Sequence, residues 1–319
     1  MRRFSRRVSV LAALLALSLS LSIPALALFD REEDAGGRPI AENFALSTYK
    51  NVAVSGALSA VDPEGDPITF RVTRNPARGE LTFADGDPSR FTYTPYENKT
   101  GKDSFTYVAE DAEGNVSQEA TVSIRIEKPA TKVTYADMDG HPAHKAAIAL
   151  AEEEVLIGER LGETWFFRPD RSVTREEFLA MAMDVVGLET LPDAAMTGFT
   201  ADESISAWAK PYVASALRSG MVQGGEGARF APDRAITQTE AAVMLNRLLR
   251  ISDVSAWGKL NGDAAPAWAY QSVVNLTAVG VLSPQPDGTV TLAETLTRAD
   301  AAQMLLAAME VLDFRDRVW

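Results

Sequence analysis

The chain has 319 residues, with 31 Lys and Arg against 44 Asp and Glu and a formal net charge of −13. An acidic chain of this kind lacks the basic face that nucleic-acid phosphates require, so we expect no nucleic-acid partner. The absence of cysteine excludes disulfides, thiolate catalysis and Cys-bound zinc.

The N-terminus has the layout of an export signal. Residues 1–7 are basic, residues 8–21 form an apolar run, and Ala-Leu-Ala at 25–27 offers small side chains for cleavage. The alternative is a membrane anchor, because the apolar run with its flanks approaches the length of a membrane span. We expect a cleaved signal peptide over 1–27, an acidic leader over 28–36, and a secreted protein that makes no membrane contact after cleavage.

Residues 37–127 alternate apolar and polar side chains, which is the period of β-strands. Turn signals rich in Asp, Pro and Gly separate the alternating segments. These segments are 68–72, 81–83, 91–94, 105–107 and 122–126. Short strands at this spacing predict an antiparallel β-sandwich of about seven strands.

Several motifs in this region occur in a fixed order. They are Asp-Pro-x-Gly-Asp at 62–66, Phe-x-Tyr-x-Pro at 91–95, and Gly-x-Asp-x-Phe-x-Tyr-x-x-x-Asp at 101–111. With these motifs the region resembles bacterial immunoglobulin-like or cadherin-like surface domains. The resemblance implies an immunoglobulin-like sandwich but no single function, because such domains serve as stalks, adhesins and spacers alike.

Acidic side chains crowd one predicted turn of the sandwich. Asp62, Glu64 and Asp66 lie in a single loop, and Asp103 and Asp111 could approach it. Ca²⁺ takes about six to eight oxygen ligands, so calcium is the candidate metal and the only candidate cofactor. The alternative is a solvated turn in which the Asp, Pro and Gly residues serve only the backbone geometry.

After a short linker at 128–132, the period becomes helical and the sequence repeats itself. Val-Thr-Arg-Glu-Glu at 173–177 returns as Ile-Thr-Gln-Thr-Glu at 236–240 and as Leu-Thr-Arg-Ala-Asp at 296–300. Each copy opens an apolar helical run. A period of about sixty residues predicts three copies of one helix-loop-helix unit. The predicted copies are 133–190, 196–252 and 257–313.

Each repeated motif combines a helix cap with a feature that capping does not explain. A Thr followed three residues later by an acid is a capping box, which fits Thr174 and Thr297 and needs no ligand. Arg175 and Arg298 occupy the first helical position, where the helix dipole disfavours a cation. A guanidinium beside free N–H groups at a helix start suits an anion. The alternative is a structural salt bridge to a neighbouring repeat.

Two further motifs accompany the repeated Thr-Arg motif. Phe-x-Pro-Asp turns occur at 167–170 and 230–233, and Trp-Ala helix starts occur at 208–209 and 268–269. Over about 133–313 the chain therefore resembles the surface-layer homology (SLH) repeats of bacterial cell-envelope proteins. The resemblance implies an all-α, pseudo-three-fold bundle with one central helix per repeat. It also implies grooves between repeats that bind a secondary cell-wall polysaccharide, often one with pyruvate ketals.

Parts of the sequence depart from the SLH pattern. Gln238 replaces the arginine of the second repeat, Pro142 replaces the tryptophan of the first, and Val290 replaces the turn phenylalanine of the third. At most two of the three expected grooves are therefore fully equipped. Trp208 and Trp268 have two interpretations, because a helix-start Trp can lock a loop to the core or offer a flat face to a sugar ring.

The sequence contains no recognisable catalytic constellation. We expect a non-enzymatic protein of the bacterial cell wall or S-layer surface, anchored non-covalently to the polysaccharide, as a monomer or in a surface lattice. The alternative is a calcium-dependent adhesin or self-assembly module in which the sandwich is the active part and the repeats are a tether. The candidate carbohydrate-binding residues are Thr174, Arg175, Trp208, Gly224, Gln238, Trp268, Thr297 and Arg298. The candidate calcium ligands are Asp62, Glu64, Asp66, Asp103 and Asp111.

Overall fold

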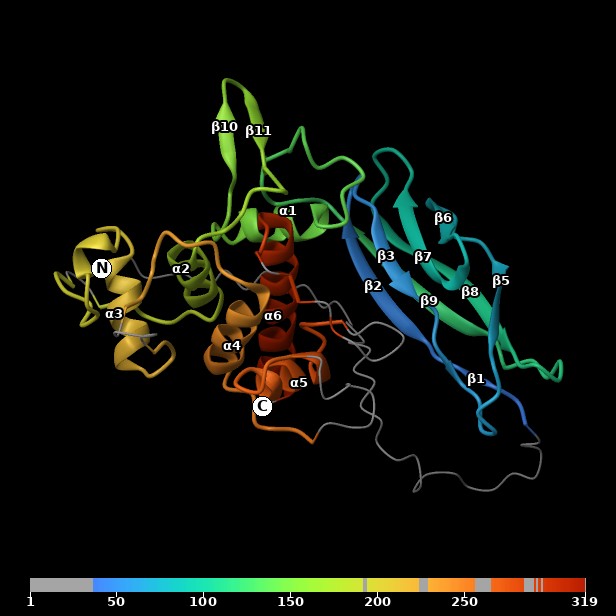
Figure 1. The fold of residues 1–319 in the computed structure, drawn as a ribbon. Helices are drawn as coiled ribbons and strands as arrows, with labels where there is room; N and C mark the ends of the chain where they lie inside the picture. The colour runs from blue at the N-terminus through green and yellow to red at the C-terminus, as the bar shows by residue number, and fades with distance from the viewer. Residues whose placement is uncertain are drawn as a thin grey trace. The chain divides into compact units, whose positions relative to one another are not determined.

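The computed structural model describes residues 37–191, 194–223, 229–255, 265–283, 290, 292–293 and 295–318 (Figure 1). The expected signal peptide, the acidic leader and Gly224 fall outside these residues. The described chain divides into two compact units, the first ending at Pro129 and the second beginning at Ala130. Within the described ranges, no helix has both the length and the apolar composition needed to cross a membrane.

The first unit contains two main sheets and a short ribbon (Figure 1). The four-stranded sheet has the order β2 (Phe44–Tyr49), β9 (Ala120–Glu127), β8 (Gly101–Glu110) and β5 (Thr69–Arg74). The three-stranded sheet has the order β3 (Val54–Ala57), β7 (Asp87–Pro95) and β6 (Gly79–Ala84). The ribbon pairs β1 (Ile40–Ala41) with β4 (Ala60–Val61).

One strand pairing corrects the expectation of a purely antiparallel sandwich. β2 runs parallel to β9, with Phe44 opposite Val122, whereas β8 runs antiparallel to both of its neighbours. From β2 the chain passes to β3, which belongs to the other main sheet. No hairpin therefore ties β2 to its neighbour, and its direction is not fixed by a tight turn.

Alternate side chains of the strands form the core of the first unit. Phe105 and Tyr107 of β8 and Phe91 and Tyr93 of β7 are all buried. Phe91 and Phe105 meet edge to face, with their ring centroids 5.1 Å apart. A Cβ atom at Gly79 would lie 2.5 Å from the Tyr93 ring, so this strand position requires glycine.

The second unit is mainly helical. Its helices are α1 (His144–Glu152), α2 (Arg175–Val185), α3 (Lys210–Arg218), α4 (Gln238–Leu249), α5 (Tyr270–Ala278) and α6 (Arg298–Val318), with a 3-10 turn η1 (Asp202–Ser204) before α3. A hairpin of β10 (Glu159–Leu161) and β11 (Thr164–Phe166) extends from the first repeat (Figure 1). The hairpin corrects the expectation of an all-α unit. Thr, Trp and Phe in β11 favour a strand, and Gly162, at φ +61°, supplies the left-handed turn residue.

The helices of the second unit pair in a closed pattern. α2 packs on α3 and α4 packs on α5, whereas α1 packs on α6. Lys145 of α1 and Glu310 of α6 add a salt bridge with an N–O distance of 3.3 Å. The first helix of this unit therefore packs against the last one.

The segments that lead into α2, α4 and α6 meet at one buried centre. The N–H of Val173 donates to the carbonyl of Leu296 at 2.9 Å, and the N–H of Leu296 donates to the carbonyl of Ile236 at 2.8 Å. The N–H of Ile236 donates to the carbonyl of Val173 at 3.0 Å. The three bonds close a ring, and all three side chains are buried. Each of these helices therefore starts from a position fixed by the other two.

Candidate functional site

Threonine caps begin the three helices that leave the ring. Thr174 Oγ1 accepts from the N–H of Glu177 at 3.3 Å, and Glu177 Oε2 accepts from the N–H of Thr174 at 3.0 Å. The same reciprocal bonds link Thr297 and Asp300, each at 3.1 Å. A capping box also opens α4. Thr174 and Thr297, which were candidate ligand-binding residues, therefore have a structural task as helix caps.

The helix starts of α2 and α6 do not offer free N–H groups. In α6, the N–H of Arg298 donates to the carbonyl of Arg171 at 2.8 Å, and that of Ala299 to the carbonyl of Pro169 at 3.0 Å. The first two N–H groups of α2 donate in the same way to the turn before α4. The third N–H of each helix is held by its cap. This corrects the prediction of an anion seat built from helix-start amides, so only the guanidinium groups remain for such a role.

Arg175 lies between the start of α2 and the turn that precedes α4. Its Nη1 is 3.3 Å from Glu240 Oε1, and its guanidinium carbon is 5.2 Å from the centre of the Phe230 ring. The same Oε1 atom is 2.6 Å from Arg234 Nη2. Burial lowers the pKa of Arg175, Glu240 opposes this shift, and Arg234 adds to it. The side chain is only 13% exposed, so Arg175 forms the structural salt bridge to a neighbouring repeat that was its alternative interpretation.

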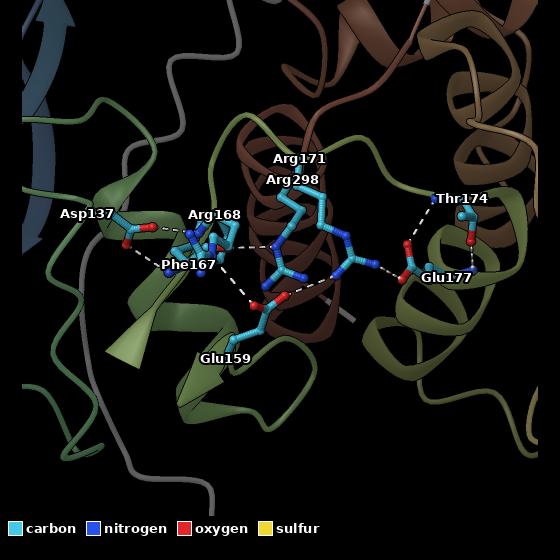
Figure 2. A network of polar contacts seen from close by, with 8 residues as sticks. All are labelled: Asp137, Glu159, Phe167, Arg168, Arg171, Thr174, Glu177 and Arg298. Atoms are coloured by element: carbon cyan, nitrogen blue, oxygen red, sulfur yellow. Dashed lines mark hydrogen bonds and ion pairs between the residues drawn. The ribbon is translucent and has the colours of Figure 1, made fainter. Parts of the chain in front are cut away.

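Arg298 occupies the equivalent position between the start of α6 and the turn that precedes α2 (Figure 2). Its Nε donates to the carbonyl of Phe167 at 2.7 Å, and its guanidinium carbon is 5.1 Å from the centre of that residue's ring. Arg298 is 7% exposed, and its buried Nη2 finds no hydrogen-bond partner among the described residues. A buried polar group left unpaired costs about 1–3 kcal/mol, and more when it is charged. Arg298 is therefore buried without the carboxylate contact that Arg175 has.

The carboxylates nearest to Arg298 are held by other arginines (Figure 2). Glu177 Oε1 is 2.6 Å from Arg171 Nη2, and Glu159 lies 3.5 Å from both Arg168 Nε and Arg171 Nη1. Burial lowers the pKa of Arg298, the Arg171 charge adds to this shift, and Glu177 and Glu159 oppose it. We call Arg298 with Phe167, Arg171 and Glu177 the Arg298 site. Its counterpart, the Arg175 site, consists of Arg175, Phe230, Arg234 and Glu240.

The start of α4, in the second repeat, lacks this arrangement. The side-chain Oε1 of Gln238 accepts from the N–H of Ala293 at 2.8 Å, and the N–H of Gln238 donates to the carbonyl of Ala293 at 3.1 Å. Val290 stands at the sequence position of the two turn phenylalanines, and Glu294 stands at that of Arg171 and Arg234. Gln238 therefore joins two backbone segments, and this position has no guanidinium of its own.

Arg171 and Arg234 were not among the candidate residues derived from the sequence. Both belong to a Pro-Asp-Arg motif that occurs at 169–171 and 232–234. In the structure each one binds the capping glutamate of the helix that follows it, at 2.6 Å. The repeated arginine was a signal in the sequence that could have identified them.

Trp208 and Trp268 lie directly before the N-caps of α3 and α5. Trp208 is 52% exposed and Trp268 is 63% exposed, so neither indole locks its loop to the core. Trp208 has Tyr212 as an edge-to-face neighbour, with the ring centroids 6.5 Å apart. Both indoles therefore retain an exposed apolar surface.

The candidate calcium ligands of the first unit are mostly engaged with the backbone. Asp62 Oδ1 accepts from the N–H groups of Glu64 and Asp66 at 3.0 and 2.9 Å. Asp103 accepts from two backbone N–H groups near residue 77 and from a tyrosine hydroxyl, and Asp111 Oδ1 accepts from two N–H groups of its own turn. Within the described ranges no set of three or more His, Asp or Glu side chains is arranged to hold a metal ion. Asp62 Oδ2 is nevertheless buried with no hydrogen-bond partner in the part of the chain that the structure describes.

Two family models match the chain. The bacterial cadherin-like domain matches residues 37–128, and the S-layer homology domain matches residues 134–179 and 201–242. The matched residues include the first two predicted repeats in part but neither α5 nor α6.

Three curated proteins illustrate the similarity. The chain is 27% identical to Cell surface glycoprotein 1 of Acetivibrio thermocellus over 154 residues, which cover 45% of this chain and 7% of that protein. It is 29% identical to the Surface-layer 125 kDa protein of Lysinibacillus sphaericus over 109 residues, covering 34% and 9%. It is 22% identical to an amylopullulanase of Thermoanaerobacterium thermosulfurigenes over 285 residues, covering 86% and 14%. The chain therefore spans no more than 14% of the length of these relatives.

Proposed function

We propose that this chain, which carries a bacterial cadherin-like domain followed by S-layer homology domains, binds a secondary cell-wall polysaccharide through the Arg298 site. The S-layer homology domains and the surface-protein relatives indicate a location at the bacterial cell wall or S-layer surface. In this proposal the helical unit is the anchor, and the β-sandwich is what the anchor displays. The protein has no catalytic role of its own.

The buried Nη2 atom of Arg298 is the observation that carries the proposal. Among the described residues it has no hydrogen-bond partner, while Glu177 is held by Arg171. An acidic sugar, such as one with a pyruvate ketal, would supply the missing carboxylate, and arginine binds carboxylates through two parallel N–H···O bonds. The ligand would reach Arg298 by displacing the side chain of Arg171, which is 44% exposed.

The Arg175 site is the second binding position in this proposal. Its guanidinium is already paired with Glu240, so a ligand carboxylate would have to replace an internal one. Binding there would be weaker, but two sites on one polymer raise retention through effective concentration. The exposed indoles of Trp208 and Trp268 offer faces on which neighbouring sugar rings could stack.

The proposed anchor consists of three repeats arranged with pseudo-three-fold symmetry. The closed ring of hydrogen bonds among Val173, Ile236 and Leu296 supports this arrangement, because each segment donates to one neighbour and accepts from the other. The packing of α1 on α6 supports it as well, since it completes the set begun by α2 with α3 and α4 with α5. In this interpretation α5 and α6 belong to a third repeat over about 257–313.

Sedimentation with purified sacculi tests the anchor. We expect the full chain to sediment with untreated sacculi and to stay in solution once acid has stripped the polysaccharide from them. Arg298→Met removes the guanidinium while keeping most of the apolar side chain, and we expect it to lose sedimentation without losing its thermal transition. Equal sedimentation of Arg298→Met and the unmodified chain would refute the proposal.

A second candidate function is favoured by the buried Asp62 Oδ2, for which the described part of the chain offers no hydrogen-bond partner. A calcium ion near this atom would satisfy it and would make the sandwich a calcium-dependent adhesin or self-assembly module, with the repeats as a tether. This function predicts that calcium raises the melting temperature of the β-sandwich unit and that a chelator reverses the change. It also predicts that chelation abolishes binding to cells, whereas the anchor proposal predicts retention by sacculi in the presence of chelator.

A further inference from the structure

The β10–β11 hairpin brings a carboxylate to the Arg298 site. Glu159, the first residue of β10, lies with Oε2 3.5 Å from Arg168 Nε and with Oε1 3.5 Å from Arg171 Nη1 (Figure 2). Both contacts are long for ion pairs, and the Glu159 side chain is 44% exposed. Glu159 is therefore weakly held, and its charge acts on the whole cluster of arginines rather than on one partner.

The charges of the cluster cancel. Three guanidinium groups lie together with two carboxylates, and the carboxylate of Asp137 at the outer end brings the formal charges into balance. The guanidinium groups belong to Arg168, Arg171 and Arg298, and the carboxylates belong to Glu159 and Glu177. Asp137 lies at the outer end of the network, where the N–H groups of Phe167 and Arg168 hold it at 2.8 Å each (Figure 2).

Among the described residues, the Arg175 site has no counterpart of the hairpin acid. There two guanidinium groups, those of Arg175 and Arg234, share the single carboxylate of Glu240. Without Glu159 the cluster around Arg298 would carry one more positive charge. The hairpin acid therefore lowers the positive charge beside Arg298 by one.

We infer that Glu159 is a specificity-determining residue that matches the Arg298 site to a singly charged carboxylate and disfavours a doubly charged phosphate. The inference rests on the proposed function of that site. Glu159 repels any bound anion, and the repulsion is about twice as large for a dianion as for a monoanion. Specificity of this kind depends on a repulsive element as much as on an attractive one.

A comparison of two sugar probes tests the inference in the full chain. The probes are a methyl glycoside with a pyruvate ketal, which carries one negative charge, and the matching 6-phosphate, which carries two at pH 8. We expect Glu159→Gln to shift the ratio of the two affinities about three- to fivefold toward the phosphate, as for removal of a partly exposed charge. Titrations followed by NMR at one fixed, low salt concentration measure the ratio.

Glu163→Gln is the matched control. Glu163 lies in the same hairpin and pairs with Arg160 at 2.8 Å, but its side chain is 94% exposed, and it takes no part in the Arg298 cluster. The control removes the same charge, and we expect it to leave the ratio unchanged. An equal shift in both variants would mean that net charge alone sets the preference, and this would overturn the inference.

The remaining outcomes separate the inference from the proposed function. If both probes bind and Glu159→Gln leaves their ratio unchanged, the inference is wrong while the proposed function stands. If Arg298→Met binds both probes as tightly as the unmodified chain, the proposed function is wrong and the inference fails with it. The same holds if the unmodified chain binds neither probe.

Discussion

The Arg175 and Arg298 sites have the same plan but differ in the contacts of the helix-start arginine. In both, the guanidinium carbon of a helix-start arginine lies about 5 Å from the ring centre of a turn phenylalanine. A second arginine, three residues before the capping threonine, binds the glutamate of that capping box. At the first site the glutamate also binds Arg175, whereas at the second the Nε of Arg298 donates to a carbonyl and Nη2 has no hydrogen-bond partner among the described residues. A repeated motif therefore fixes where a guanidinium lies but not whether its charge is already balanced.

The largest difference that we expect between the two sites is in binding to the cell wall. Arg298→Met should lower the affinity for sacculi at least about tenfold, because a charge-assisted bidentate contact would be lost. Arg175→Met should lower it only about two- to threefold, because that guanidinium is occupied within the protein. Sedimentation against increasing amounts of sacculi measures both affinities. Equal losses would show that the internal salt bridge does not restrain Arg175.

For stability the order should reverse, with the larger loss in Arg175→Met. Arg175→Met breaks a mostly buried pair, so we expect the free energy of unfolding to fall by about 1–2 kcal/mol. Arg298→Met removes an unpaired buried charge at the cost of one hydrogen bond, so we expect a change within about 0.5 kcal/mol. Urea denaturation followed by circular dichroism measures both values. A larger loss in Arg298→Met would indicate a structural role for that residue.

Acid should weaken the Arg175 site through Glu240. Burial alone would raise the pKa of Glu240, but its bonds to Arg234 and to the N–H of Thr237 and the Arg175 charge outweigh burial and lower the pKa from 4.5. A carboxyl with a lowered pKa stabilises the fold above its unfolded value, and this stabilisation is lost as the pH falls through the folded value. As the pH falls from about 5 to about 3, we therefore expect the free energy of unfolding to decline less in Glu240→Gln than in the unmodified chain. A decline as steep as in the unmodified chain would assign the acid sensitivity to other carboxyls.

The smallest effect that we expect comes from introducing an arginine at the start of α4, in the second repeat. Gln238→Arg alone should change sacculus binding less than about twofold, because Val290 and Glu294 replace the phenylalanine and the second arginine. The triple change Gln238→Arg, Val290→Phe and Glu294→Arg should increase binding relative to the single change. A clear gain from Gln238→Arg alone would show that one guanidinium is sufficient.

Much of the local structure was predictable because it depends on nearby residues. Alternation and turn signals predicted a sandwich of about seven strands and located five of them, and the two main sheets contain seven. The Thr-x-x-acid pattern predicted caps that the structure confirms at Thr174 and Thr297. The parallel β2–β9 pair was not predictable in this way, since it joins segments from opposite ends of the sandwich. The β10–β11 hairpin was missed because its strands are only three residues long.

The site was only partly predictable for a related reason. The sequence indicated Arg175 and Arg298 as a pair, but the choice between an anion site and a salt bridge depends on which carboxylate comes within reach. That carboxylate belongs to the next repeat for Arg175, about sixty residues away in the sequence. The helix-start amides were wrongly expected to be free, because the carbonyls that occupy them also come from a neighbouring repeat. The binding roles of Trp208 and Trp268 stay predictions.

The packing of α1 on α6 has a consequence for folding. The chain is synthesised from its N-terminus, so α1 is complete long before α6 and its apolar face stays uncovered until α6 follows. The β-sandwich emerges earlier and needs nothing from the helices for its own core. Maturation of the helical unit should therefore be a late, all-or-none event, and a chain arrested before residue 298 should be a substrate for quality-control proteases.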